Sequence, residues 1–216
     1  MMHFISYISR LIDFITRVYN AKIRSLYYTS RLGECGKNVF IKKPLTYSNL
    51  QNIIMEDNTS IDYGMTFMSV TGKLIMKKGS GASAGLTVIT GTHIREIGEP
   101  FKEGRSSHHN GDKEGDIIVG ENVWIGVNVT LLYGAKIGRE AILGAGTVCS
   151  KVIPPYAIVK GNPAKIVGFV FTPEEAIEHE KMLYPENERL SLEVLEHNYD
   201  KYFLNHLSDI KEFRRL

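Results

Sequence analysis

A period of six residues dominates the apolar pattern in the second half of the chain. From Val119 onward an apolar residue returns at every sixth position, and glycine directly follows four of them. These apolar positions are Val119, Ile125, Leu131, Ile137, Leu143 and Cys149. A small or β-branched residue stands four positions after most of them, at Val123, Val129, Ala135, Ala141 and Thr147. Two weaker rows precede them, at Met55, Ile61 and Phe67 and at Met76, Ala82 and Val88, with Thr59, Met65, Ser80 and Leu86 at the fourth offset.

This period fits neither an α-helix nor one long strand. A helix would turn every sixth residue by about 240° from the last, so the apolar residues would not share a face. Glycine at regular intervals would weaken a long strand. A coil of short strands that bends after every six residues resolves both problems, with both kinds of repeated side chain pointing inward and glycine at the bends. Such coils stack their strands in parallel, so the period predicts a mainly β fold, a parallel β-helix of hexapeptide repeats.

A helical pattern precedes the repeats. Apolar residues recur there at spacings of three and four, which indicates one face of a helix that runs to about residue 29. They are Phe4, Ile8, Leu11, Ile12, Ile15 and Tyr19. We expect this face to pack on the domain and cover one end of the coil. The alternative is contact with a membrane surface, given four basic residues beside the aromatics, Arg10, Arg17, Lys22 and Arg24. Charges within the segment disfavour both a signal peptide and a membrane span.

Helical patterns return after the repeats. Thr172, Pro173 and Glu175 form the signature of a helix start, with an N-cap, a first-turn proline and a capping-box partner. A second helix is predicted from about Ser191, with one apolar face made of Leu192, Leu195, Tyr199, Tyr202, Phe203, Leu207 and Ile210. The chain therefore divides into a helical segment 1–30, a β-helix 31–168 and a helical extension 169–216 that covers the other end.

A polar stretch, residues 89–116, interrupts the repeats. It contains His93, His108 and His109, three of the seven histidines of the chain. Long loops that leave a regular fold are usually functional or disordered. We therefore treat the three histidines as candidates for chemistry.

The charge and the cysteine content argue against several classes of protein. The formal net charge is only +2 and no basic run is present, so nucleic-acid binding is not expected. The two cysteines, Cys35 and Cys149, are far apart and form neither a disulfide framework nor a zinc motif. We expect both to be reduced, as in a cytoplasmic protein.

Three motifs, "VWIG", "ILGAG" and "GNPAKIV", occur in that order within about residues 115–168. In this region the chain resembles the hexapeptide-repeat acyltransferases, in the branch that includes maltose, galactoside, xenobiotic and bacterial polysaccharide O-acetyltransferases. The resemblance implies a left-handed β-helix, a homotrimer with active sites between subunits, acetyl-CoA as co-substrate, and no metal. The left hand comes from the resemblance alone, because general connection rules favour right-handed crossovers.

The resemblance also implies catalytic residues. His93 matches the general base of the family, and it would face the CoA groove of a neighbouring subunit. An imidazole can accept the proton of an acceptor hydroxyl near neutral pH, and backbone N–H groups can stabilise the oxyanion. Transfer in the family is direct, so Cys149, on the inward ladder, is interpreted as a core residue. The alternative for His93 is a structural loop histidine.

Other residues are expected to line the acceptor side of the site. Trp124 lies between inward Val123 and Ile125, so strand alternation sends it outward, and the matching tryptophan of the family borders the active site. Packing beneath the loop is its alternative. His108 and His109 are candidates for the acceptor wall, or solvated loop residues. A zinc site of the carbonic-anhydrase type, also built on this fold, would need two histidines five residues apart, and this pair is adjacent.

The resemblance places coenzyme A along the later coils. Val127 and Ala145 would present backbone groups to the pantetheine arm, while Gly126 and Gly144 would let it approach. Positions that meet the phosphates and adenine correspond to Ser150, Lys151 and Lys165. The family often has arginine where this chain has Lys165, and both lysines could equally be solvated surface residues.

Together these features predict an acetyl-CoA-dependent O-acetyltransferase that acts on a sugar hydroxyl. The acceptor is expected to be a surface polysaccharide or its precursor, by analogy with enzymes that carry a similar loop and tail. A xenobiotic O-acetyltransferase and a non-catalytic trimeric scaffold remain alternatives. The expected location is cytoplasmic, with membrane association through the N-terminal helix left open.

Overall fold

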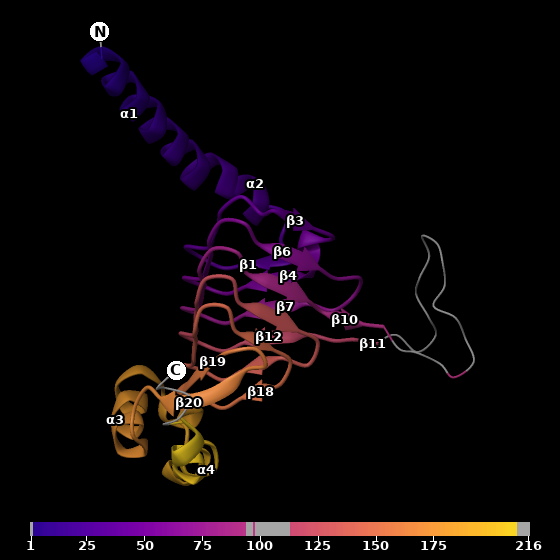
Figure 1. Cartoon of the computed structure of the whole chain (residues 1–216), viewed down its shortest axis with the longest axis vertical. Coiled ribbons are helices and arrows are strands. Elements are labelled where there is room, and N and C mark those ends of the chain that lie inside the picture. Colours follow the sequence, from indigo (N-terminus) through magenta and orange to yellow (C-terminus); the bar gives the residue numbers. More distant parts are fainter. Residues whose placement is uncertain (1, 94–96, 98–112, 211–216) are drawn as a thin grey trace.

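The chain folds into a stack of coils built from short strands, as seen in the computed structural model, which describes residues 2–93, 97 and 113–210 (Figure 1). The strands of the coils form three sheets, one along each side of the coil, and all of them pair in parallel except the last strand of one sheet. Face 1 contains β1 (Glu34–Cys35), β4 (Ile53–Met55), β7 (Leu74–Met76), β12 (Ile117–Val119), β15 (Lys136–Ile137) and β18 (Val152–Ile153). Face 2 contains β2 (Phe40–Ile41), β5 (Ser60–Ile61), β8 (Gly81–Ala82), β13 (Trp124–Ile125), β16 (Ile142–Leu143), β19 (Ala157–Lys160) and β20 (Lys165–Phe169). Face 3 contains β3 (Thr46–Tyr47), β6 (Thr66–Met68), β9 (Thr87–Ile89), β14 (Thr130–Leu132) and β17 (Val148–Cys149).

Along the repeats, successive strands lie on face 1, face 2 and face 3 in turn, so three strands complete one coil. Each strand pairs in parallel with the strand of the next coil, and Val119 lies opposite Ile137, three hexapeptides later. This arrangement is a left-handed parallel β-helix, as predicted. A short 3-10 helix, Leu50–Asn52, precedes the second coil.

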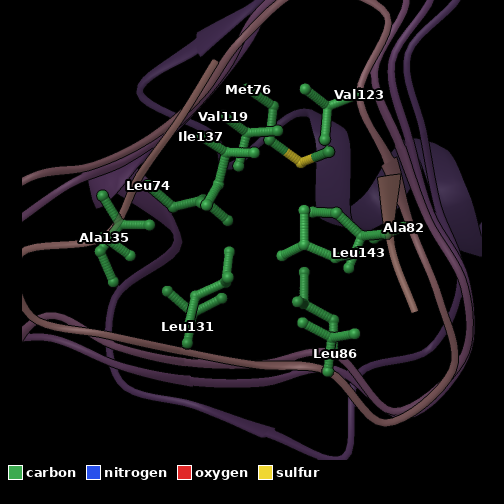
Figure 2. Packing of buried hydrophobic residues seen from close by; sticks show 14 of the residues in the cluster. Leu74, Met76, Ala82, Leu86, Val119, Val123, Leu131, Ala135, Ile137 and Leu143 are labelled. Carbon is green, nitrogen blue, oxygen red and sulfur yellow. The ribbon is translucent and has the colours of Figure 1, made fainter. Parts of the chain in front are cut away.

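Both repeated sets of side chains fill the interior of the coil (Figure 2). Every position of the two series, including the weaker early rows, is buried. Polar residues at the fourth offset satisfy their hydroxyl groups locally. Thr59, Ser80 and Thr147 each donate to the carbonyl three residues earlier at 2.7 Å. The hydrogen bonds explain why these hydroxyls are tolerated in an apolar interior.

The glycines that follow the ladder positions lie between strands, at the bends, as expected, and they also let neighbouring coils approach each other. A Cβ at Gly126 would lie 2.7 Å from the backbone N of Ala145, and one at Gly120 would lie 2.6 Å from that of Arg139. These glycines therefore allow consecutive coils to stack closely. Several of the turns instead use asparagine in the left-handed region, as at Asn122 with φ 52° and Asn128 with φ 55°.

The C-terminal extension covers its end of the coil as predicted. Strand β20 turns back antiparallel to β19 and leads into α3 (Pro173–Leu183), which begins with the predicted capping box at Thr172. After a 3-10 turn, Glu186–Glu188, the chain forms α4 (Leu192–Tyr202). The predicted continuous second helix is interrupted at Phe203 by a 3-10 turn, Leu204–His206. On its apolar face Leu195 and Ile210 are buried, but Leu192 is exposed.

The N-terminal segment is helical to Thr29, as predicted, but it does not pack as expected. It consists of α1 (Met2–Val18), a π-helical stretch (Tyr19–Arg24) and α2 (Ser25–Thr29). Only α2 closes the coil, because Tyr28 is buried and the Ser25 hydroxyl accepts the N–H of Ile41 at 3.1 Å. Helix α1 projects away from the strands (Figure 1) with its apolar face exposed. No helix among the described residues has the length and apolar character needed to cross a membrane.

The insertion after the third coil begins and ends as a hairpin. Strands β10 (Gly91–Thr92) and β11 (Lys113–Glu114) pair antiparallel, with Gly91 opposite Glu114. The N–H of Gly115 donates to the carbonyl of Thr90 at 3.1 Å, where the chain rejoins the coil. The predicted loop 89–116 thus has an ordered base.

Candidate functional site

His93 lies at the end of β10, at the edge of a hollow of about 310 Å³. The hollow lies between the insertion and the turn that follows β6. Its lining residues are Ser48, Met68, Ser69, Val70, Ile89, Gly91, Thr92, His93, Lys113 and Glu114. The side chain of His93 is exposed, so its imidazole is accessible to a small molecule that enters the hollow.

A carboxylate holds the base of this hollow together. Glu114 accepts backbone N–H groups from Val70 at 3.2 Å, Thr71 at 3.2 Å and Gly72 at 2.7 Å. The hydroxyl of Thr90 donates to the same carboxylate at 2.9 Å. Burial would raise the pKa of Glu114, but the hydrogen bonds from Gly72, Thr90, Thr71 and Val70 outweigh it and lower the pKa below its usual range.

The packing around Glu114 leaves little space for a side chain at Gly91 or Gly72. A Cβ at Gly91 would lie 2.6 Å from Glu114 Oε1, and a Cβ at Gly72 would lie 2.7 Å from the Cβ of Thr90. Glu114 thereby ties the hairpin that carries His93 to the preceding coil. The role of Glu114 was not predicted from the sequence, because residue spacing does not reveal which backbone N–H groups a carboxylate will accept.

Trp124 points outward from face 2, as predicted, and is 62% exposed. It borders a second hollow of about 260 Å³ between neighbouring coils. Lys42 and Asp62 in this hollow form an ion pair at 2.8 Å. In a single chain Trp124 and His93 therefore line different hollows, on different sides of the coil.

The predicted pantetheine contacts form a column along the coil axis. Val127 and Ala145 occupy equivalent turns between faces 2 and 3, and the Val127 carbonyl accepts the N–H of Gly146 at 2.8 Å. Both residues are exposed. The space beside Gly126 is filled by the next coil, and a Cβ at Gly144 would lie 3.0 Å from Lys160 Cγ. Packing within the chain is therefore enough to explain why both positions are glycine. Contact of these glycines with a ligand stays a prediction.

The two predicted phosphate-binding lysines share a third hollow, of about 420 Å³. Lys151 and Lys165 line it from the last coils, while Tyr202 and His206 line it from the C-terminal extension. Ser150 is exposed nearby in the sequence but does not line this hollow. The motifs predicted the lysines, whereas the contribution of the extension depends on long-range packing that no motif reveals.

The predicted residues thus fall on two different edges of the triangle. His93 and Lys151 lie on the edge between faces 3 and 1, while Val127 and Ala145 lie on the edge between faces 2 and 3. A single chain therefore separates the candidate base from the candidate pantetheine contacts.

The remaining candidates are His108, His109 and Cys149. His108 and His109 lie outside the described residues. Cys149 is fully buried, and burial raises the pKa of its thiol, which confirms its interpretation as a core residue. Within the described part of the chain, no three His, Cys, Asp or Glu side chains gather as a metal site would require.

Comparison with known proteins places the repeats in a family. Residues 116–151 match the family described as bacterial transferase hexapeptide (six repeats). The chain is 44% identical over 63 residues to a chloramphenicol acetyltransferase of Klebsiella aerogenes, a match that covers 29% of this chain and 30% of that protein. A chloramphenicol acetyltransferase of Escherichia coli is 41% identical over 63 residues, again 29% and 30% of the two chains. The chain thus matches about a third of the length of these relatives.

Solved structures share the fold over most of the chain. A maltose O-acetyltransferase from Clostridium difficile 630 superposes with a TM-score of 0.58 at 22% identity, covering 75% of this chain and 86% of that one. A galactoside acetyltransferase in complex with coenzyme A gives 0.57 at 20% identity, covering 76% and 75%. Residues 116–151 are therefore bacterial transferase hexapeptide repeats, and the chain has the left-handed β-helix fold of the hexapeptide-repeat acetyltransferases.

Proposed function

We propose that the protein transfers an acetyl group from acetyl-CoA to a sugar hydroxyl, with His93 as the general base. The observation that carries the proposal is the position of His93, which is exposed at a hollow whose base the Glu114 carboxylate fixes. Support comes from the fold, which is similar to that of solved acetyltransferases in complex with acetyl-CoA or coenzyme A.

The reaction needs few groups. The imidazole of His93 accepts the proton of the acceptor hydroxyl as its oxygen attacks the thioester carbonyl carbon. The C–S bond then breaks, and the imidazolium returns the proton to the departing thiolate of coenzyme A. Backbone N–H groups stabilise the oxyanion between these steps. No residue forms a covalent acyl intermediate, in keeping with the buried position of Cys149.

The separation of the candidate residues supports a homotrimer whose sites lie between subunits. If a second chain presents its edge with Val127 and Ala145 to the edge that carries His93, the base meets the pantetheine arm. A cyclic trimer makes this contact three times, because each interface joins two different surfaces. Lys151 and Lys165 would then bind the phosphates of coenzyme A as point charges.

The acceptor we propose is a saccharide, and a surface polysaccharide or its precursor is the expected biological form. The folds of maltose and galactoside acetyltransferases support a sugar. A small xenobiotic acceptor is the second candidate, favoured by the 44% identity to a chloramphenicol acetyltransferase over the repeats. A cytoplasmic location is proposed from the two unpaired cysteines.

The primary test measures thiol release from acetyl-CoA in the presence of saccharides or chloramphenicol. We expect His93→Ala to lower turnover by about a hundredfold or more while coenzyme A still binds. His197→Ala, a change of the same kind at an exposed position of α4, should retain activity. Full turnover by His93→Ala would exclude His93 as the base, and failure of the wild-type chain to bind coenzyme A would favour a scaffold.

A mixing experiment tests the two-chain site. We expect His93→Ala and Trp124→Ala to be inactive when each is expressed alone. Mixed trimers made by co-expression should recover part of the activity, because some interfaces then contain both wild-type residues. No recovery from assembled mixed trimers, or a monomeric mass by light scattering, would contradict a site between subunits.

A further inference from the structure

Helix α1 lies away from the strands of the β-helix (Figure 1), and its apolar side chains are exposed. Eight large apolar side chains of this helix expose 40–70% of their surface. They are Ile5, Tyr7, Ile8, Leu11, Ile12, Phe14, Ile15 and Val18. A surface of this extent on a folded chain indicates an interaction site.

The apolar surface spans about half of the helix circumference, given about 100° of rotation per residue. The opposite half carries Ser6, Ser9, Arg10, Asp13 and Thr16. Such a division into equal apolar and polar halves is typical of a helix that lies at the boundary between lipid and water. A helix that packs on one neighbouring helix needs only a narrow stripe.

The charge of this segment is also distinct from that of the rest of the chain. The first 33 residues contain five Lys and Arg but a single acidic residue, Asp13. Across the whole chain the numbers are nearly balanced, 26 basic against 24 acidic. The segment therefore combines an apolar half with an excess of positive charge, which favours a negatively charged lipid surface.

A second copy of the chain is the competing occupant. Ile5, Ile8, Ile12 and Ile15 are spaced as the seam of a coiled coil, and isoleucine at such positions favours trimers. However, a coiled coil along this seam would bury only part of the apolar half of α1. It would leave the stripe of Tyr7, Leu11, Phe14 and Val18 largely uncovered, whereas a lipid surface covers both.

We propose that α1 lies in the interfacial region of a membrane that contains anionic lipids. Its apolar half enters the boundary between headgroups and acyl chains, and its polar half faces water. Three apolar side chains between α1 and the first coil, Ile23, Leu26 and Tyr27, are exposed as well. The proposal is independent of the acetyltransferase assignment, because it concerns a surface remote from His93.

The test is sedimentation of the full chain with vesicles. Wild-type protein should sediment with vesicles of phosphatidylcholine and phosphatidylglycerol, and much less with phosphatidylcholine alone. Ile12→Glu should weaken binding by at least about tenfold, because it places a charge in the apolar half. The matched control, Ser9→Glu, makes the same change in charge on the polar half and should retain most of the binding.

Three outcomes would overturn the proposal. The first is no sedimentation with either vesicle. The second is an equal loss for Ile12→Glu and Ser9→Glu, which would mean that charge alone matters. The third is a lower oligomeric mass of Ile12→Glu by light scattering with unchanged vesicle binding, which would assign the surface to other copies of the chain. Matching thermal unfolding of both variants and wild type ensures that the comparison concerns folded protein.

Discussion

Helices with an apolar face flank both ends of the β-helix. The helices at the C-terminal end bury part of that face, whereas α1 at the N-terminal end leaves it exposed. At the C-terminal end Ala176 of α3 and Leu195 of α4 pack with Tyr156 of the last coil in a cluster of their own. At the N-terminal end only α2 reaches the core, through Tyr28, and α1 leaves its apolar half exposed. Sequence periodicity therefore identifies the face but does not identify what covers it.

Polar contacts explain much of the difference. At the C-terminal end, the fully buried carboxylate of Glu180 accepts from Tyr156 Oη at 2.7 Å, from Arg139 Nη1 at 3.2 Å and from the N–H of Leu190 at 3.0 Å. This network fixes the extension to the last coils. At the N-terminal end the contact with the β-helix runs through α2, where the Ser25 hydroxyl accepts the N–H of Ile41.

The largest predicted effect is at Glu180. Glu180→Ala should lower the free energy of unfolding by about 3–5 kcal/mol, because it leaves Arg139 next to a cavity without its carboxylate. Urea unfolding followed by circular dichroism measures this change. Glu178→Ala, on the exposed side of the same helix, should stay within about 0.5 kcal/mol of wild type. Equal effects of the two variants would contradict the role of the buried network.

A smaller effect is expected at Tyr156. Tyr156→Phe removes only the hydroxyl that donates to Glu180 and should cost about 1.5–3 kcal/mol, as for a hydrogen bond to a charged group. The same substitution at Tyr7, which is 70% exposed on α1, should leave the midpoint of urea unfolding unchanged. A midpoint for Tyr156→Phe that equals that of wild type would show that the C-terminal end does not depend on this bond.

The insertion offers an intermediate case, because a single carboxylate attaches it. Glu114→Gln should accelerate hydrogen exchange at the amides of Val70, Thr71 and Gly72, while global unfolding changes by only about 1 kcal/mol. Turnover should fall without a change in coenzyme A affinity. Since the pKa of Glu114 is lowered in the folded state, its contribution is complete above its usual value of 4.5 and is lost as the pH falls through the lowered value. Unchanged exchange in the variant would argue against the clamp.

The smallest effect is expected on α1. Ile12→Ala should change the free energy of unfolding by less than about 0.5 kcal/mol, because Ile12 is already 57% exposed. Ile125→Ala, the same change within the inward ladder, should cost about 2–5 kcal/mol. A large effect of Ile12→Ala in the absence of lipid would mean that α1 has a protein partner in solution.

The parts of the molecule that were predictable are those set by repeating contacts. The period of six predicted the burial of Val119 and of every later ladder position, because each coil repeats the same packing problem. The asparagine turns were missed, since Asn122 and Asn128 are marked by backbone conformation and not by apolarity. The candidate site was predicted only in part. Motifs indicated His93 and the lysines. Glu114 and Tyr202 line the same hollows as these residues, through contacts between segments far apart in the sequence.

The geometry of the insertion has a consequence for how such proteins diversify. The chain leaves the coil at Thr90 and returns at Gly115, and these two residues are joined by a hydrogen bond. The coils before and after stay in register, as β12 pairs directly with β7. The coil is therefore closed beneath the insertion. The stretch between His93 and Lys113 can therefore change in length while the coils beneath it stay in register.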